Sequence, residues 1–89
     1  MKHLNLIVSG KVQGVFFRAS TLKVALQLGV KGFVRNQPDG TVYIEAEGDH
    51  RELEQFVAWC RSGPPGAQVQ QVEITESHVK HFRTFEIAV

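Results

Sequence analysis

The stretch VKGFVRNQPDGTVYIEAEG, residues 30–48, decides the fold of this chain. Residues 30–36 and 41–48 each have the pattern of a β-strand, and the tetrapeptide QPDG, residues 37–40, connects them. Pro38 presets the backbone for a turn, and Gly40 tolerates a positive φ. The stretch therefore predicts a β-hairpin, and the elements on either side of it determine the architecture.

A helix is predicted immediately before the hairpin. Within residues 18–28, apolar side chains recur at helical spacing, at Ala19, Leu22, Ala25 and Leu26. Gly29 follows, at a position where a left-handed residue can end a helix. We expect these apolar residues to form the buried stripe of that helix.

A second helix is predicted immediately after the hairpin. Asp49 occupies a capping position, and Glu52 three residues later completes a variant of the capping box. The apolar stripe of this helix consists of Leu53, Phe56, Val57 and Cys60. Gly63 and the PPG tripeptide after it stop the helix.

The outer strands complete the pattern. From Leu4 onward apolar and polar residues alternate, as in a half-buried strand. Residues 69–76 form a fourth strand whose register is unsettled, because Val69 and Val72 fall on opposite faces, and residues 83–89 form a fifth. The order βαββαβ plus a strand predicts an α+β, ferredoxin-like sandwich, with an antiparallel four- to five-stranded sheet and both helices on one face.

Length and composition narrow the functional classes. Eighty-nine residues, 43% of them apolar, predict one domain over residues 1–89. The formal charge of +1 provides no global field for nucleic acid or an acidic membrane surface. Cys60 is the only cysteine and cannot form an internal disulfide, and the N-terminal apolar run is too short for a signal peptide or membrane span. We therefore expect a cytoplasmic protein.

The loop between the first strand and the first helix predicts an anion site. Gly10 and Gly14 allow the backbone to bend so that several N–H groups converge at the positive end of the helix. Arg18 adds a planar guanidinium that matches two phosphate oxygens and stays protonated. The predicted ligand is a phosphoryl group.

Known phosphate motifs narrow the chemistry. The Walker pattern and the GxGxxG pattern are both absent, so binding of a magnesium nucleotide is not supported. A phosphatase loop with a nucleophilic cysteine would place that cysteine six residues before the arginine, where this chain has Val12. If the loop catalyses a reaction, water must attack directly, which favours a substrate with a good leaving group.

Two long motifs resemble the acylphosphatase family. They are GKVQGVFFR at residues 10–18 and GFVRNQPDGTV at residues 32–42, and the resemblance continues through GPPGAQVQQV at residues 63–72. It covers essentially the whole chain. The last residues, FEIAV, depart from the basic or aromatic ending frequent in the family, which bears on how the terminus packs near the loop.

The resemblance implies a function and a set of site residues. It implies hydrolysis of acyl phosphates to a carboxylate and inorganic phosphate, without a metal or other cofactor, by a monomer that phosphate inhibits competitively. Arg18 is expected to bind the phosphoryl group and Asn36 to position the attacking water. The expected phosphate cradle consists of Val12, Gln13, Gly14, Val15, Phe16 and Phe17.

Other interpretations of the same residues stay open at this point. Arg18 could be an ordinary surface arginine, and the loop could serve a non-catalytic regulatory module that only binds phosphate or another anion. An RNA-binding domain of the same chain order would use aromatics such as Phe33 and Tyr43 to stack bases, although the two glutamates in residues 41–48 and the low net charge argue against it. The four histidines lie mostly on different elements and do not predict a metal site.

Overall fold

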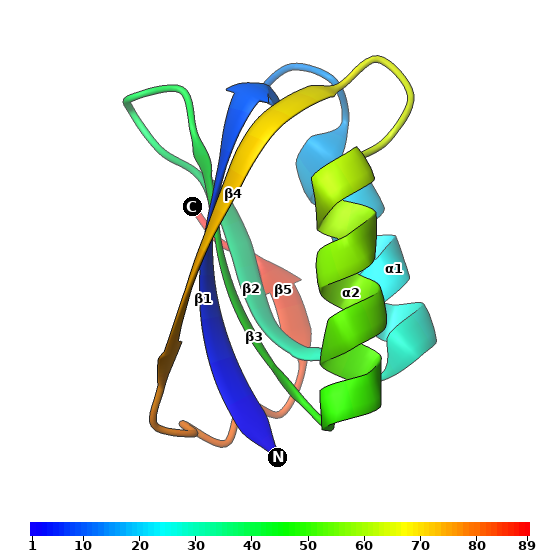
Figure 1. Cartoon of the computed structure of the whole chain (residues 1–89), viewed down its shortest axis with the longest axis vertical. Coiled ribbons are helices and arrows are strands. Elements are labelled where there is room, and N and C mark those ends of the chain that lie inside the picture. Colours follow the sequence, from blue (N-terminus) through cyan, green and yellow to red (C-terminus); the bar gives the residue numbers. More distant parts are fainter.

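Five strands form one sheet, and two helices cover a single face of it (Figure 1). The computed structural model describes residues 1–89. Its elements are β1 (Lys2–Lys11), α1 (Phe17–Leu28), β2 (Lys31–Asn36), β3 (Val42–Gly48), α2 (His50–Ser62), β4 (Gln68–Ser77) and β5 (Phe85–Ile87). The strand order is β4-β1-β3-β2-β5. This arrangement confirms the expected βαββαβ sandwich.

The sheet is mixed because its last strand runs parallel to its neighbour. β1, β2, β3 and β4 pair antiparallel, as expected, whereas β5 pairs parallel with β2. β5 is also shorter than the predicted strand at residues 83–89. The backbone N–H of Ala88 still donates to the carbonyl of Val34 at 2.8 Å, but Val89 beyond it is fully exposed.

A β-bulge resolves the register of β4. Ser9 pairs with Gln71 and Gly10 pairs with Val69, so Gln70 is the extra residue. The bulge turns both Val69 and Val72 toward the core, although strict alternation places them on opposite faces. Gly10 has a φ of 120°, and a Cβ there would lie 2.1 Å from the carbonyl oxygen of Gln68. Only glycine fits at this point, where β1 ends and the loop begins.

The buried stripe of α1 differs from the prediction. Phe17, Thr21 and Ala25 are buried, whereas Ala19 is exposed and Leu26 is 63% exposed. The buried position of Thr21 is possible because its hydroxyl donates a hydrogen bond of 2.7 Å to the Phe17 carbonyl. Of the predicted stripe, Ala25 is buried and Leu22 packs against the core, whereas Ala19 and Leu26 face outward.

The helix α2 follows the predicted pattern. The backbone N–H of Asp49 donates to the Glu52 carboxylate at 3.1 Å, which closes the capping box. Leu53, Phe56 and Cys60 are buried against the sheet. Burial raises the pKa of the Cys60 thiol to about 12, against a smaller lowering by the nearby Arg61 charge. Neither α1 nor α2 is long and apolar enough to cross a membrane.

A buried polar cluster lies on the sheet face that the helices leave uncovered. His3 Nδ1 lies 2.7 Å from Glu47 Oε2, and His3 Nε2 lies 3.0 Å from Glu45 Oε1. The Glu47 carboxylate also accepts hydrogen bonds from the backbone N–H groups of Lys80 and Phe82. The cluster thus fastens the connection between β4 and β5 to the end of the sheet opposite the β1–α1 loop (Figure 1).

Candidate functional site

The loop between β1 and α1 exposes a run of unpaired backbone donors. None of the N–H groups from Gln13 to Ala19 donates to a backbone carbonyl; the first that does is that of Ser20, to Phe16 at 3.0 Å. Gly14 (φ 74°) and Phe16 (φ 61°) both take left-handed conformations, which curl the loop into the helix. Unpaired N–H groups at the N-terminus of a helix create a site for an anion.

A cavity of about 370 Å³ opens beside this loop. Its walls come from the loop, the first turn of α1, the end of β2 and β5. The lining residues are Val12, Gly14, Phe16, Phe17, Arg18, Ala19, Asn36 and Ile87. The fold therefore brings the two predicted catalytic residues to one cavity, together with four of the predicted cradle residues.

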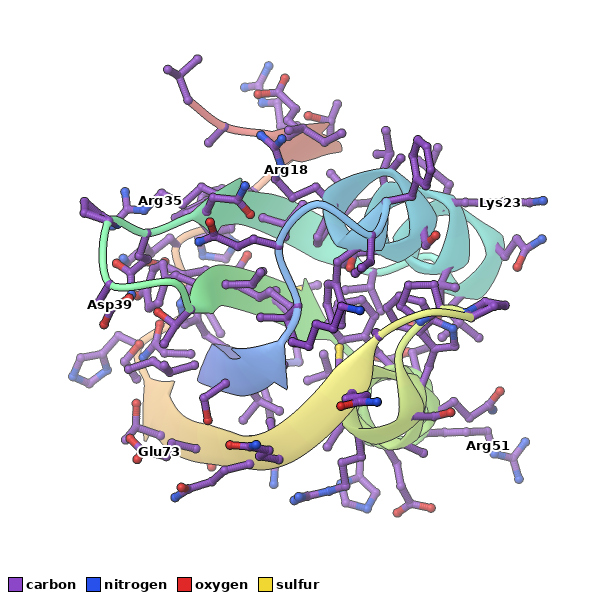
Figure 2. The ribbon with its side chains drawn as sticks, turned by 90° about the horizontal axis from the view of Figure 1, so that it is seen from above. Arg18, Lys23, Arg35, Asp39, Arg51 and Glu73 are labelled. Atoms are coloured by element: carbon purple, nitrogen blue, oxygen red, sulfur yellow. The ribbon has the colours of Figure 1, made fainter.

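Arg18 supplies the charge of this cavity. It is the only charged residue in the cavity wall, and its guanidinium forms neither an ion pair nor a hydrogen bond with any protein group. Figure 2 shows the Arg18 side chain extending from the start of α1 toward β5. Because no carboxylate neutralises it, the full charge and all the guanidinium donors are available to an anionic ligand.

Asn36 reaches the same cavity from the sheet. It is the last residue of β2, and its backbone pairs with Val42 of β3, which fixes the position of its Cα. The side chain is half-buried, and its amide forms no hydrogen bond with another protein group. The amide therefore offers both a donor and an acceptor to whatever enters the cavity.

The side chains of Gln13 and Val15, two other predicted cradle residues, lie outside the cavity wall. Gln13 Nε2 donates to the carbonyl oxygens of Gln37 at 2.8 Å and Thr41 at 2.9 Å. Val15 packs against the core. Through Gln13 the loop is tied to the turn that immediately follows Asn36, so the cradle and Asn36 are held at a fixed separation.

Two residues of the cavity wall were not predicted from the sequence, Ala19 and Ile87, and only Ile87 lies far in sequence from the loop. β5 borders β2, and this places the Ile87 side chain in the wall beside Arg18 and Asn36. The altered ending FEIAV was the only indication in the sequence that the terminus mattered here. The parallel pairing of β5 with β2 places Ile87 at the site, and no pattern in the sequence predicted this pairing.

The structure gives no support to the RNA-binding interpretation. The Arg35 guanidinium lies 5.0 Å from the ring centroid of Tyr43 and 5.7 Å from that of Phe33. The rings of Phe33 and Phe82 form a T-shaped pair with a centroid distance of 5.9 Å. Both rings are thus engaged by side chains of the protein and are half-buried, unlike the open aromatic platform on which bases stack. In addition, no three histidine, cysteine, aspartate or glutamate side chains meet in an arrangement that would hold a metal ion.

Known proteins share both the sequence and the fold. Residues 4–87 match the acylphosphatase family. An acylphosphatase of Archaeoglobus fulgidus is 47% identical over 85 residues, which are 96% of each chain. The crystal structure of an acylphosphatase from Bacillus subtilis superposes with a TM-score of 0.98 at 36% identity, over the full length of both chains. That of an acylphosphatase from Coxiella burnetii gives 0.94 at 37% identity, over 98% of this chain and 92% of the other.

Proposed function

The chain belongs to the acylphosphatase family and is a hydrolase of acyl phosphates, and we propose that the cavity beside the β1–α1 loop is its active site. A single observation carries this proposal. The unpaired loop amides, the unpartnered Arg18 guanidinium and the free Asn36 amide all meet in one cavity. None of these groups pairs with another protein group; the phosphoryl group would pair with the loop amides and Arg18, and the attacking water with Asn36.

The loop and Arg18 hold the phosphoryl group in this proposal. The unpaired N–H groups from Val12 to Phe17 surround its oxygens, and Arg18 contacts two of them with its planar fork. Charge that develops on these oxygens during transfer is stabilised by donors that are already in place before the substrate arrives. The same donors bind inorganic phosphate, which is therefore a competitive inhibitor as well as a product.

Asn36 positions the attacking water. Its carbonyl oxygen accepts one hydrogen of the water, which directs the water oxygen at phosphorus without any change in the charge of Asn36. The new P–O bond forms as the bond to the acyl oxygen breaks, and the carboxylate leaves with the electron pair opposite the water. The water proton passes to a phosphoryl oxygen. Because a carboxylate is a good leaving group, the site needs no general acid.

No covalent intermediate is part of this mechanism. Val12 stands where a loop phosphatase would have its cysteine, and Cys60 is buried in the core away from the cavity. Positioning and charge stabilisation supply the catalysis, and we expect it to proceed without added metal. We further propose that the protein acts as a cytoplasmic monomer.

The decisive experiment is an assay of the purified chain. Acetyl phosphate hydrolysis is followed with and without a chelator, and 4-nitrophenyl phosphate serves as a phosphate monoester control. We expect turnover of acetyl phosphate in both conditions and little turnover of the monoester. An anion-binding module without activity would bind phosphate but leave acetyl phosphate intact, and a loss of activity with chelator would contradict the metal-free mechanism.

A further inference from the structure

We propose that the acyl side of the active site accepts uncharged, apolar acyl groups, held between the side chains of Phe16 and Ile87. This inference rests on the proposed function and extends it to the substrate class. The phosphoryl group occupies the part of the cavity beside the loop amides and Arg18. The acyl group then faces the remaining wall, whose large side chains are hydrophobic.

Phe16 presents an exposed aromatic ring to the cavity. Its ring is 83% exposed, although it lines the cavity, and its backbone has a φ of 61°. An aromatic residue in the left-handed region is strained by about 1–2 kcal/mol. The exposed ring recovers little of this cost, because it buries almost no apolar surface in the protein itself. A ligand that covers the ring would bury that surface.

Ile87 of β5 presents a second exposed apolar side chain to the cavity. It is 41% exposed, whereas Phe85 on the same short strand is 96% buried, with 4% exposed. The parallel pairing of β5 with β2 fixes the Ile87 backbone, so the side chain is held in place rather than carried on a free terminus. Two exposed apolar side chains from distant parts of the chain thus line one cavity.

The charge of the cavity wall disfavours substrates whose acyl group carries a second anion. Arg18 is the only charged residue that lines the cavity, and the phosphoryl group uses it. An acyl group with a second carboxylate or phosphate would find no cation to pair with it and would be desolvated against Phe16 and Ile87. An aromatic or branched aliphatic acyl group instead gains contact with both side chains.

The test compares three substrates on the wild-type chain and on variants of Ile87. The substrates are acetyl phosphate, benzoyl phosphate and succinyl phosphate, whose acyl groups are small, aromatic and anionic. Ile87→Ser removes the apolar surface, Ile87→Leu preserves it as the matched control, and Ile87→Arg adds a cation. Thermal unfolding checks that each variant folds, and the inhibition constant of inorganic phosphate checks the phosphoryl side.

We expect the wild-type kcat/KM to be highest for benzoyl phosphate and lowest for succinyl phosphate. The ratio of kcat/KM for benzoyl phosphate to that for acetyl phosphate should fall about 10-fold in Ile87→Ser and stay near wild type in Ile87→Leu. In Ile87→Arg, kcat/KM for succinyl phosphate should rise relative to that for the other two substrates. An unchanged ratio in a folded Ile87→Ser variant, or a wild-type preference for succinyl phosphate, would overturn the inference. Absence of turnover with all three substrates would instead contradict the proposed function.

Discussion

The side-chain amide of Gln13 donates a hydrogen bond of 2.8 Å to the backbone carbonyl of Gln37, the residue that follows Asn36. The same nitrogen donates to the carbonyl of Thr41 at 2.9 Å. One amide therefore spans the β2–β3 turn and attaches the phosphate loop to it. In the proposed mechanism, different elements position the attacking water and the phosphoryl group, and Gln13 links those elements.

Gln13→Leu should lower kcat by about 10- to 100-fold, because a small displacement of Asn36 from the cradle misaligns the water. The inhibition constant of phosphate should change much less, since the loop amides and Arg18 are retained. Steady-state kinetics with acetyl phosphate measure both quantities. Gln55→Leu, at an exposed position of α2, is the matched control. A Gln13→Leu variant with the wild-type kcat would show that the loop keeps its place without this bond.

Arg18→Lys should reduce kcat/KM by at least about 10³-fold, because a point charge cannot reproduce two parallel hydrogen bonds to the phosphoryl group. Arg51→Lys is the matched control, since Arg51 lies on α2, away from the β1–α1 loop (Figure 2). Hydrolysis rates of the two variants are compared at a temperature at which thermal unfolding shows both to be folded. Near-normal activity in Arg18→Lys would refute the role of the planar fork.

Asn36→Ala should lower kcat by about 10²-fold and leave the inhibition constant of phosphate nearly unchanged. The side chain forms no hydrogen bond within the protein, so its loss should have little effect on stability. Kinetics with phosphate as inhibitor separate the two roles of this residue. If the affinity for phosphate collapsed in parallel with kcat, Asn36 would be a binding residue rather than a positioner of water.

Gly10→Ala and Gly14→Ala should differ sharply in stability. A methyl group on Gly10 would lie 2.1 Å from the Gln68 carbonyl oxygen, whereas one on Gly14 would meet no atom within 4 Å. We expect Gly10→Ala to lose about 3 kcal/mol or more of unfolding free energy. Gly14→Ala should lose about 1 kcal/mol, from the left-handed backbone alone. Urea titrations measure both, and equal losses would contradict the close approach at Gly10.

The cluster around Glu47 should make stability fall in acid. Burial by itself would raise the pKa of Glu47, but the hydrogen bonds from the Lys80 backbone, His3 and the Phe82 backbone together hold it below its usual value. The ionised carboxylate therefore favours the folded state. This contribution is complete above the unfolded pKa of about 4.3 and is lost as the pH falls through the lower folded value.

Glu47→Gln tests that dependence. The variant should unfold at a lower temperature than wild type at pH 7, and its melting temperature should fall less steeply between about pH 5 and pH 3. Glu76→Gln, at an exposed position of β4, should leave the wild-type profile unchanged. Activity at 25 °C should persist in Glu47→Gln, because the cluster lies at the end of the sheet opposite the cavity. A wild-type pH profile in Glu47→Gln would refute the role of this carboxylate.

Local patterns in the sequence predicted most of the fold. Alternation at Leu4, Leu6 and Val8, the turn at Pro38 and the capping pair Asp49 and Glu52 each depend on residues close in the chain. The bulge at Gln70 could not be predicted, because it depends on how β4 pairs with β1. The buried stripe of α1 was predicted correctly at Leu22 and Ala25 but not at Thr21, whose hydroxyl is satisfied within the helix and which takes an inward position.

The residues of the candidate site that lie within the two motifs, residues 10–18 and 32–42, could be predicted from the sequence. Arg18, Asn36 and the glycines belong to continuous motifs, so their meeting in one cavity follows from the strand and helix order. Gln13 belongs to the same motif, but the contact of its side chain with the β2–β3 turn could not be predicted, and Ile87 lies outside the motifs. Each acts through a contact with a segment far away in sequence, the β2–β3 turn in one case and the wall beside β2 in the other.

The buried thiol on α2 provides an intrinsic reporter for this chain. Cys60 has no solvent-accessible surface, and a thiol with a pKa of about 12 carries almost no thiolate at neutral pH. A maleimide or disulfide reagent can therefore label it only in molecules that have opened the core. At reagent concentrations high enough for labelling to outpace reclosing, the labelling rate equals the opening rate, so the lifetime of the native state can be followed without adding a dye or a tag.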